Sequence, residues 1–468
     1  MKSAAATLRG RRTIGPLWLC HLLRFLDRFD FRPSEVQECF REVDGERFAE
    51  KWGQQPVEPL GCRMTPQENE IHTGEESWWQ DPYANLAAVR EHYRTGVTSE
   101  GLKAILRWED AEDLLKGDRF ENEGLEFIER RGFRPGDALY EWRRHSIGAL
   151  NGEDHRRIRS LVSRALTHRS VDGMRPRIRD HARNLLQGSH AAGEIEARAS
   201  FAQRLPFLTI TDFLGIELEE ALTVAEKMGQ GSADAFGPRV TQEIRDNANG
   251  AFAAMMEFVG ELYENRRSEP REDLLTDLIQ AEEGGDRLSH EELIVLFTNI
   301  FGGAIETTAS VITSGIFELA CHPKQAALLR SDPERWKHGA TEEILRHRPG
   351  FYAAGKRATC AHEAYGLAFE EGESISIVIG GPNRDPVRWE DPDRFDITRD
   401  PRNWSLSFSM GEHFCLGQAL ARAEIQEAMA VFVTECDAIE LAEQPRWMPY
   451  VMVNRLESLL LRYRPASA

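Results

Sequence analysis

Apolar residues recur at a spacing of three and four positions through most of the chain from residue 81 onward. This spacing places apolar side chains on one face of an α-helix and therefore predicts amphipathic helices. The clearest helical segments are residues 86–93, 158–166, 251–263, 293–319 and 419–433. Short β-prone runs are few, and the clearest are residues 102–106 and 374–379. The pattern predicts a mainly α fold with small β-sheets.

Residues 1–78 differ from the rest of the chain. They contain no recognisable motif, and residues 53–76 are rich in Gly, Pro and Glu, a composition typical of a linker. The length of 468 residues allows either two or three average domains or one large domain around a buried cofactor. We predict an N-terminal extension of unknown role over residues 1–78 and a single domain over residues 79–468.

The composition narrows the classes of function. Asp and Glu outnumber Lys and Arg by 77 to 58, and the net charge of -19 disfavours nonspecific binding to nucleic acid. The seven cysteines are scattered and form no C-x-x-C pair, which fits neither a disulfide framework nor a zinc site. The apolar run at residues 14–25 contains His21 and Arg24 and is too short to span a bilayer. We predict a cytoplasmic protein without a membrane span.

The most specific pattern is a loop around Cys415. It reads Phe408-Ser-Met-Gly-Glu-His413-Phe-Cys415-Leu-Gly417 and directly precedes the predicted helix at residues 419–433. Backbone N–H groups and the dipole at a helix N-terminus favour a thiolate over a thiol, and a thiolate can bind a soft metal. The glycines allow tight turns and close approach of the backbone to a flat cofactor. The alternative is an inert, buried thiol, the usual state of an isolated cysteine.

The pattern F-x-x-G-x-H-x-C-x-G in this loop resembles the haem-binding loop of the cytochrome P450 superfamily, with every fixed position present. The resemblance covers residues 79–468 and implies the cytochrome P450 fold. It also implies that Cys415 ligates the iron of haem b (iron protoporphyrin IX), with Phe408 and Gly417 beside the cofactor. A thiolate ligand of this kind pushes electron density toward the O–O bond.

A second match concerns the scaffold behind the haem. Glu343-Ile-Leu-Arg346 resembles the E-x-x-R signature of the family, and a spacing of three places both side chains on one helix face. Arg394 lies in a segment that resembles the family's P-x-R-F motif. The resemblance implies an ion-pair cluster of Glu343, Arg346 and Arg394. Without the resemblance, Glu343 and Arg346 would be an ordinary surface pair.

A third match concerns the haem propionates. His155 and Arg159 resemble the family's H-x-x-x-R helix, and a spacing of four lets both donate to one anionic group. The resemblance assigns the same role to His413. The family usually has a further arginine where Lys356 stands here, and lysine offers a point charge rather than a bidentate fork. Arg357 is the second candidate for this contact.

Oxygen chemistry is predicted for residues 301–308, inside the long apolar helix. This segment resembles A/G-G-x-D/E-T-T, where the family's helix loosens over the haem, although Ala304 replaces the usual second glycine. Glu306 and Thr307 then supply the acid and the alcohol that relay protons to bound oxygen. The alternatives are a helix-surface carboxylate for Glu306 and a hydroxyl bonded to its own helix for Thr307.

The predicted substrate is a small apolar organic molecule, because the residues that line the pocket in this family are mostly apolar here. The pocket segments include residues 124–149. The individual pocket residues are Ile300, Gly303, Ala304, Phe351, Tyr352, Ala353, Val451 and Met452.

The resemblance implies a monooxygenase that inserts one atom of O2 into its substrate. Electrons come from NAD(P)H through a ferredoxin and a ferredoxin reductase, and Arg402, Arg422 and Arg446 are candidates for a basic docking patch. One alternative is a peroxide-driven or isomerising haem-thiolate enzyme without a redox partner, although Glu306 and Thr307 count against it. The other alternative is a noncatalytic haem-binding sensor.

Overall fold

The computed structural model describes residues 68–165, 168–190, 192–229, 235–236, 240–271, 273–281, 288–448 and 453–466. The predictions for residues 1–67, including the apolar run at 14–25, lie outside this part of the chain. The pocket residues Val451 and Met452 lie outside it as well. Residues 68–78, which the sequence assigned to the extension, contribute β1 and the beginning of α3 to the folded unit.

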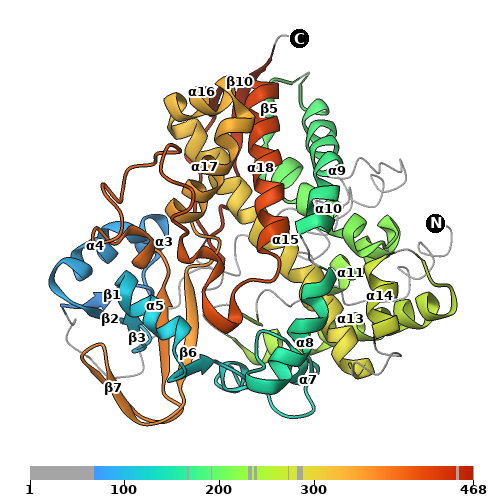
Figure 1. Cartoon of the computed structure of the whole chain (residues 1–468), viewed down its shortest axis with the longest axis vertical. Helices are drawn as coiled ribbons and strands as arrows, with labels where there is room; N and C mark the ends of the chain where they lie inside the picture. The colour runs from blue at the N-terminus through green and yellow to red at the C-terminus, as the bar shows by residue number, and fades with distance from the viewer. Residues whose placement is uncertain are drawn as a thin grey trace, which may run out of the picture. The chain divides into compact units, whose positions relative to one another are not determined.

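Helices make up most of the described chain (Figure 1). The α-helices are α3 (Glu76–Gln80), α4 (Pro82–His92), α5 (Trp108–Lys116), α6 (Glu126–Glu129), α7 (Ala138–His145), α8 (Gly152–Ala165), α9 (His168–Gln187), α10 (Arg204–Leu214), α11 (Leu218–Gly229), α13 (Gln242–Ser268), α14 (Leu274–Ala281), α15 (His290–Cys321), α16 (Pro323–Ser331), α17 (Pro333–His347) and α18 (Gln418–Glu435). A π-helix, η2 (Arg198–Ala202), and the 3-10 helices η4 (Pro382–Arg384), η5 (Leu406–Phe408) and η6 (Gly411–His413) complete the set. All five predicted helical segments are confirmed, in α4, α8, α13, α15 and α18.

The strands form three small sheets. They are β1 (Glu70–Ile71), β2 (Thr95–Thr98), β3 (Lys103–Ile105), β4 (Phe120–Asn122), β5 (Glu194–Glu196), β6 (Ala353–Ala358), β7 (His362–Ala364), β8 (Leu367–Phe369), β9 (Ser374–Val378), β10 (Cys436–Leu441) and β11 (Leu460–Pro465). The largest sheet has the order β1-β2-β3-β9-β6-β4, and it contains both predicted strands, as β3 and β9. The prediction of a mainly α fold with small sheets is therefore confirmed.

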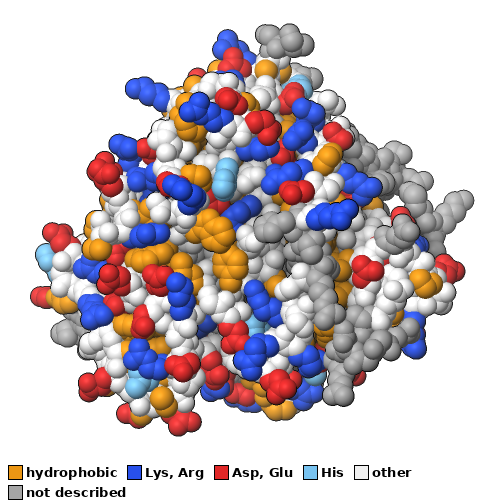
Figure 2. All heavy atoms as spheres, viewed as in Figure 1, with side chains coloured by type: hydrophobic (Ala, Val, Ile, Leu, Met, Phe, Trp, Pro, Cys, Tyr) orange, Lys and Arg blue, Asp and Glu red, His pale blue; other side chains and the backbone are white. Residues whose placement is uncertain are grey.

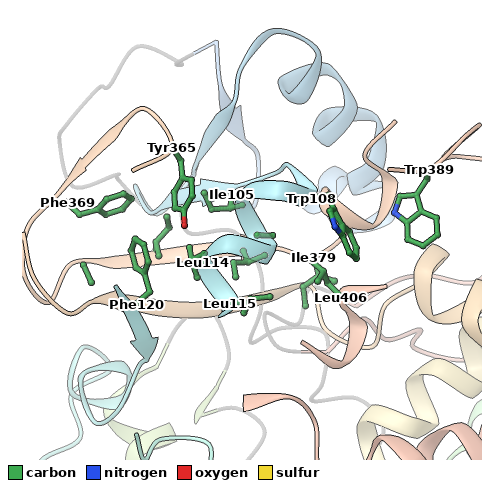
Figure 3. Packing of buried hydrophobic residues seen from close by; sticks show 14 residues of the cluster. Ile105, Trp108, Leu114, Leu115, Phe120, Tyr365, Phe369, Ile379, Trp389 and Leu406 are labelled. Atoms are coloured by element: carbon green, nitrogen blue, oxygen red, sulfur yellow. The ribbon is translucent and has the colours of Figure 1, made fainter. Parts of the chain in front are cut away.

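One apolar core fixes the large sheet against α5. Ile105 of β3, Leu114 and Leu115 of α5 and Phe120 of β4 are buried together, and Figure 3 shows their side chains facing one another. Phe369 packs edge-on against Phe120, with ring centroids 5.1 Å apart. This core holds β4 and β6, the two strands that carry residues to the candidate site.

The helix α15 passes through the middle of the folded unit, behind α18 (Figure 1). It starts at a capping box in which the Ser289 hydroxyl accepts from the Glu292 N–H and the Glu292 carboxylate accepts from the Ser289 N–H. By length and composition α15 could cross a membrane, and it is the one helix of the described ranges that could. It packs against α10, α13, α17 and α18, which accounts for its apolar composition as that of a core helix.

Candidate active site

Hydrogen bonds and one glycine hold the Cys415 loop. The N–H of Cys415 donates to the carbonyl oxygen of Phe408 over 3.0 Å and closes the loop around η6. Gly411 has a φ of 69°, and a Cβ added there would lie 2.2 Å from the carbonyl oxygen of Leu115. Only glycine fits at this position, because both the backbone conformation and the approach to α5 exclude a side chain.

The sequence predicts that the helix N-terminus favours a thiolate at Cys415, but two opposing effects act on the pKa of this thiol. The N–H groups of Gly417 and Gln418 at the start of α18 lower its pKa, as do the charges of Arg159 and Arg422. Burial is the larger effect and raises the pKa of the Cys415 thiol. A thiolate at this position therefore needs further positive charge, such as a bound metal cation, to be stable.

The E-x-x-R pair lies behind this loop on α17. Arg346 and Glu343 are 1% and 2% exposed, and two N···O contacts of 2.8 Å join them. The Arg346 guanidinium also donates to the main-chain carbonyl oxygens of Asn383 (3.1 Å), Pro392 (2.6 Å) and Arg394 (3.1 Å). This pair is therefore buried rather than an ordinary surface pair.

The prediction that Arg394 is the third member of the cluster is wrong. The Arg394 side chain is 62% exposed and pairs with Asp396 over 2.5 Å, while only its carbonyl oxygen faces Arg346. The turn at residues 391–396 directs the Arg394 side chain to solvent. Arg399 takes the expected place, with its Nε 3.3 Å from Glu343 Oε1. The segment that follows the P-x-R-F motif carries this arginine, and the motif itself does not indicate it.

Asn383 connects the buried pair to the Cys415 loop. Its side-chain oxygen accepts from the N–H of Leu406 over 2.8 Å, and its amide nitrogen donates to Ser407 Oγ over 3.2 Å. Its carbonyl oxygen is one of the acceptors of Arg346. The segment before Phe408 is therefore fixed to the same scaffold as Glu343 and Arg346.

Four basic side chains lie beside the loop, as the sequence predicted for propionate binding. The rings of His155 and His413 lie with their centroids 4.0 Å apart, and His413 Nε2 donates to Asn151 Oδ1 over 3.1 Å. Arg159 donates to the carbonyl oxygen of Phe414 over 2.6 Å. Burial, with the charges of His155, Lys356 and Arg159, lowers the pKa of His413 to about 3. Asn151 is a member of this group that the sequence did not indicate.

Lys356 is the most informative of the four. It is 4% exposed, and within the described ranges its ammonium group has no hydrogen-bond or ion-pair partner. Burial lowers its pKa to about 8. The His155 Nδ1 atom is also buried without a hydrogen bond, and it lies 3.6 Å from Oε1 of Glu412. Because an unpaired buried charge is costly, this group of donors fits an anionic ligand such as the two propionates of haem.

Arg357 lies apart from these donors. Successive side chains of a strand point to opposite faces, so Arg357 leaves β6 on the other side from Lys356. It pairs with Glu121 over 2.5 Å and with Glu126 over 3.1 Å. The structure therefore brings Lys356 to the donor group and does not bring Arg357 there.

The segment of α15 at residues 301–308 has accessible surface although the helix is a core element. Gly303 is exposed, whereas Phe301 and Thr308 are buried. A Cβ added at Gly303 or at Gly417 would meet no atom within 4 Å. Space therefore exists beside each of the two segments, as a bulky cofactor bound there would require.

The expected loosening of α15 is absent from this segment. The helix is a continuous α-helix from His290 to Cys321, and the Thr307 hydroxyl donates to the carbonyl oxygen of Gly303 over 2.6 Å. This is the bond within the helix that was the alternative for Thr307. Gly302 lies against α11, where a Cβ would displace the flexible end of the Met228 side chain.

Glu306 has partners that the sequence did not indicate. Arg198 of the π-helix η2 donates to its carboxylate over 2.6 Å, and Arg455 and Gln203 donate over 3.4 Å each. Arg198 is 108 positions away in sequence, so no local spacing could have revealed the pair. Glu306 is therefore a paired carboxylate next to the accessible part of α15.

The remaining predicted pocket residues divide into two groups. Ile300, Ala304, Phe351 and Ala353 are half-buried and have accessible surface. Tyr352 belongs to a separate core, where its ring lies 5.7 Å from that of Trp78 and 5.0 Å from that of Trp79. Successive side chains along an extended chain point to opposite sides, so Tyr352 points away from the side to which Phe351 and Ala353 point. The assignment of Tyr352 to the pocket is therefore wrong.

Comparisons with known proteins agree on one family. The family model described as Cytochrome P450 matches residues 232–335 and 339–459. The chain is 33% identical over 406 residues to Cytochrome P450 107B1 of Saccharopolyspora erythraea, covering 83% of this chain and 96% of that protein. It is 32% identical over 321 residues to 6-deoxyerythronolide B hydroxylase of the same organism, covering 68% and 78%.

A solved structure gives the same result. The crystal structure of P450BioI in complex with hexadec-9Z-enoic acid ligated acyl carrier protein matches with a TM-score of 0.77 and 26% identity. The match covers 83% of this chain and all of that chain. From the loop around Cys415, the buried E-x-x-R pair and these similarities together, the chain belongs to the cytochrome P450 family.

Proposed function

We propose that Cys415 provides the thiolate ligand of the haem iron and that His155, Arg159, Lys356 and His413 bind the haem propionates. The chain is an oxygen-incorporating oxidoreductase of its family, and haem b is the cofactor that activates O2. The observation that carries the assignment is Lys356, a buried residue whose ammonium has no hydrogen-bond or ion-pair partner among the described residues and lies near His413 of the Cys415 loop. A carboxylate ligand would supply the charge that this group lacks.

Glu306 and Thr307 are the proposed proton relay. The net reaction is RH + O2 + two electrons + two protons giving ROH + water. The Thr307 hydroxyl is oriented along α15 by its bond to Gly303, and the Glu306 carboxylate contacts Arg198 over 2.6 Å. A carboxylate that exchanges between Arg198 and water would pass protons to the Thr307 hydroxyl, and with haem in place this hydroxyl would hold them on the α15 side of the site.

We further propose that NAD(P)H delivers electrons through a ferredoxin and its reductase, and that the protein works in the cytoplasm. The three arginines that were expected to form a basic docking patch do not support docking of a ferredoxin, because each has an acidic partner. Arg422 is buried against Glu342, Arg402 pairs with Asp400, and Arg446 pairs with Glu76. Figure 2 shows acidic and basic side chains interspersed on the face that it presents. The peroxide-driven alternative is tested by turnover with hydrogen peroxide alone.

The proposed substrate is a small apolar organic molecule. Half-buried Ile300, Phe351 and Ala304 support this proposal, as does the name of one relative, which hydroxylates 6-deoxyerythronolide B. Apolar walls with few polar groups are usual for such pockets.

Replacing Lys356 with methionine is expected to weaken haem retention by about tenfold or more, because a charge-assisted hydrogen bond contributes about 1.5–3 kcal/mol. The measurement is the rate of haem transfer to an acceptor apoprotein. Since the pKa of Lys356 in the haem-free protein is about 8, the charged donor is lost as the pH rises, and haem affinity should fall above that pH. Lys356→Arg should remove this fall, because arginine stays charged. Equal retention by Lys356→Met and the parent protein would exclude the propionate contact.

Thr307→Ala should leave haem binding intact and lower the fraction of electrons recovered as hydroxylated product, with hydrogen peroxide released instead. A positioned proton donor contributes roughly 10²- to 10⁴-fold, which sets the upper scale of the effect. Product and peroxide are measured per NAD(P)H consumed, with redox partners in excess. Thr313→Ala is the matched control, since Thr313 makes the same bond within α15, to Ala309 over 2.6 Å. Unchanged coupling in Thr307→Ala would rule out the relay.

A further inference from the structure

Two arginines flank one aromatic ring in the segment that follows β4. The guanidinium carbon of Arg131 lies 3.8 Å from the centre of the Phe127 ring, and that of Arg143 lies 5.6 Å from it. Arg143 is on α7, and Arg131 follows α6. Guanidinium groups stack favourably on aromatic faces, so Phe127 holds the two cations close to each other despite their repulsion.

Within the described residues neither guanidinium forms an ion pair, although the charges of Glu123 and Glu126 are near enough to raise the pKa of Arg143 and that of Glu123 is near enough to raise the pKa of Arg131. Arg143 donates to the carbonyl oxygens of Glu123 over 2.9 Å and Gly124 over 3.3 Å. Arg131 donates to the carbonyl oxygen of Phe127 over 3.0 Å, and its Nε is buried without a hydrogen bond.

The neighbouring arginines of the same segment behave differently. Arg130 pairs with Glu123 over 2.7 Å, and Arg144 pairs with Glu141 over 2.9 Å. The chain as a whole has 77 acidic and 58 basic residues, so acidic partners are abundant. Arg131 and Arg143 instead donate to main-chain carbonyl oxygens and form no direct ion pair, so both guanidiniums keep donor capacity for an anionic ligand.

The two half-buried side chains form one wall of partly accessible surface. Arg143 keeps accessible surface, yet burial lowers the pKa of its guanidinium to about 10, and burial also lowers that of Arg131. Both guanidiniums are therefore largely desolvated but keep surface that a ligand can contact.

Contacts of α7 place this wall next to the active segment of α15. Trp142, the neighbour of Arg143, donates from its indole nitrogen to Thr298 Oγ1 over 2.8 Å, about one helical turn before Gly303. On the other side, the anchoring carbonyls of Glu123 and Gly124 directly follow Asn122, whose register partner in β6 is Lys356.

Apolar side chains surround the arginines. The Phe127 ring stacks on that of Phe236, with centroids 6.1 Å apart and planes 21° apart. Met228 and Trp142 pack on the same apolar cluster, and Met228 also approaches Gly302 of α15. A ligand at this wall therefore meets both an apolar surface and two cations.

We propose that Arg131 and Arg143 bind a carboxylate of the substrate, so that the substrate class is an apolar molecule that carries a carboxylate group. A planar guanidinium binds a carboxylate through two parallel hydrogen bonds, and the aromatic surroundings bury the rest of the ligand. This inference rests on the proposed function, because it requires the haem to lie between α15 and the Cys415 loop.

The experiment uses the full-length holoprotein and a series of ω-(imidazol-1-yl)alkanoic acids with their matching primary amides. The imidazole ligates the haem iron and shifts the Soret band, so each dissociation constant can be measured whatever the natural substrate is. We expect the acid to bind about tenfold or more tightly than the amide at the chain lengths that reach the arginines. Arg143→Gln and Arg131→Gln should each bring the acid-to-amide ratio toward one. Arg144→Gln, an exposed and paired arginine of the same helix, should keep the ratio of the parent protein.

Results that contradict the carboxylate site can be distinguished from results that contradict the proposed function. Equal binding of acid and amide at every chain length would overturn the carboxylate site. An unchanged preference for the acid in both Arg143→Gln and Arg131→Gln would also overturn it. If these variants lost haem while keeping the preference, the arginines would serve the cofactor rather than the substrate, and the inference would be wrong. A Soret band that no azole shifts would contradict the proposed function itself, and the carboxylate site with it.

Discussion

Cys415→Ser is expected to reduce product formation to background and to leave haem, where it stays bound, without thiolate ligation. The reason is that serine cannot supply the electron donation of a sulfur ligand to the iron, whereas the propionate donors remain in place. The measurements are the haem content per chain and the product formed from a substrate that shifts the haem spin state of the parent protein. This is the largest effect on activity that the account predicts.

The control for this change is Cys360→Ser. Cys360 is an exposed free cysteine between β6 and β7, so its replacement should alter neither haem content nor turnover. Parent-like product formation by Cys415→Ser would show that another residue ligates the iron.

Glu343→Gln is expected to lower the free energy of unfolding by about 3–5 kcal/mol, because it leaves the Arg346 charge buried without its partner. That is a large part of the total stability of a typical folded protein. Unfolding of the holoprotein in urea, followed by fluorescence and by haem absorption, measures the change. Haem release should accompany unfolding at lower urea, since Asn383 joins the same scaffold to the Cys415 loop.

Arg394→Gln and Arg399→Gln form the matched comparison. The Arg394 side chain is exposed, so Arg394→Gln should leave the free energy of unfolding almost unchanged. The Arg399 side chain contacts Glu343 and is only 17% exposed, so Arg399→Gln should lower the free energy of unfolding clearly more than Arg394→Gln does. The reverse order would restore the sequence-based cluster of Glu343, Arg346 and Arg394 and contradict the structure.

The sequence predicted those features that depend on local spacing. The helices follow from their apolar periodicity, and the pairs His155–Arg159 and Glu343–Arg346 follow from the separation of residues on one helix face. The loop around Cys415 could be identified because its fixed positions lie within ten residues of one another.

Features that depend on distant segments could not be predicted in this way. The choice between Lys356 and Arg357 depends on how β6 is paired with β4 and β9, and only one of the two faces the donor group. The pairing of Glu306 with Arg198 joins residues that only the packing of η2 on α15 brings together. Burial of the Cys415 thiol, which outweighs the helix N-terminus in setting its pKa, is likewise a property of the complete fold.

The measurement that tests the central claim most directly is the absorption spectrum of the reduced, CO-bound holoprotein. Thiolate ligation by Cys415 predicts a Soret band at about 450 nm in the parent protein and at about 420 nm in any haem-bound fraction of Cys415→Ser. A band at about 420 nm in the folded, haem-loaded parent protein, or a band that stays at about 450 nm in Cys415→Ser, would contradict the assignment of Cys415 as the iron ligand.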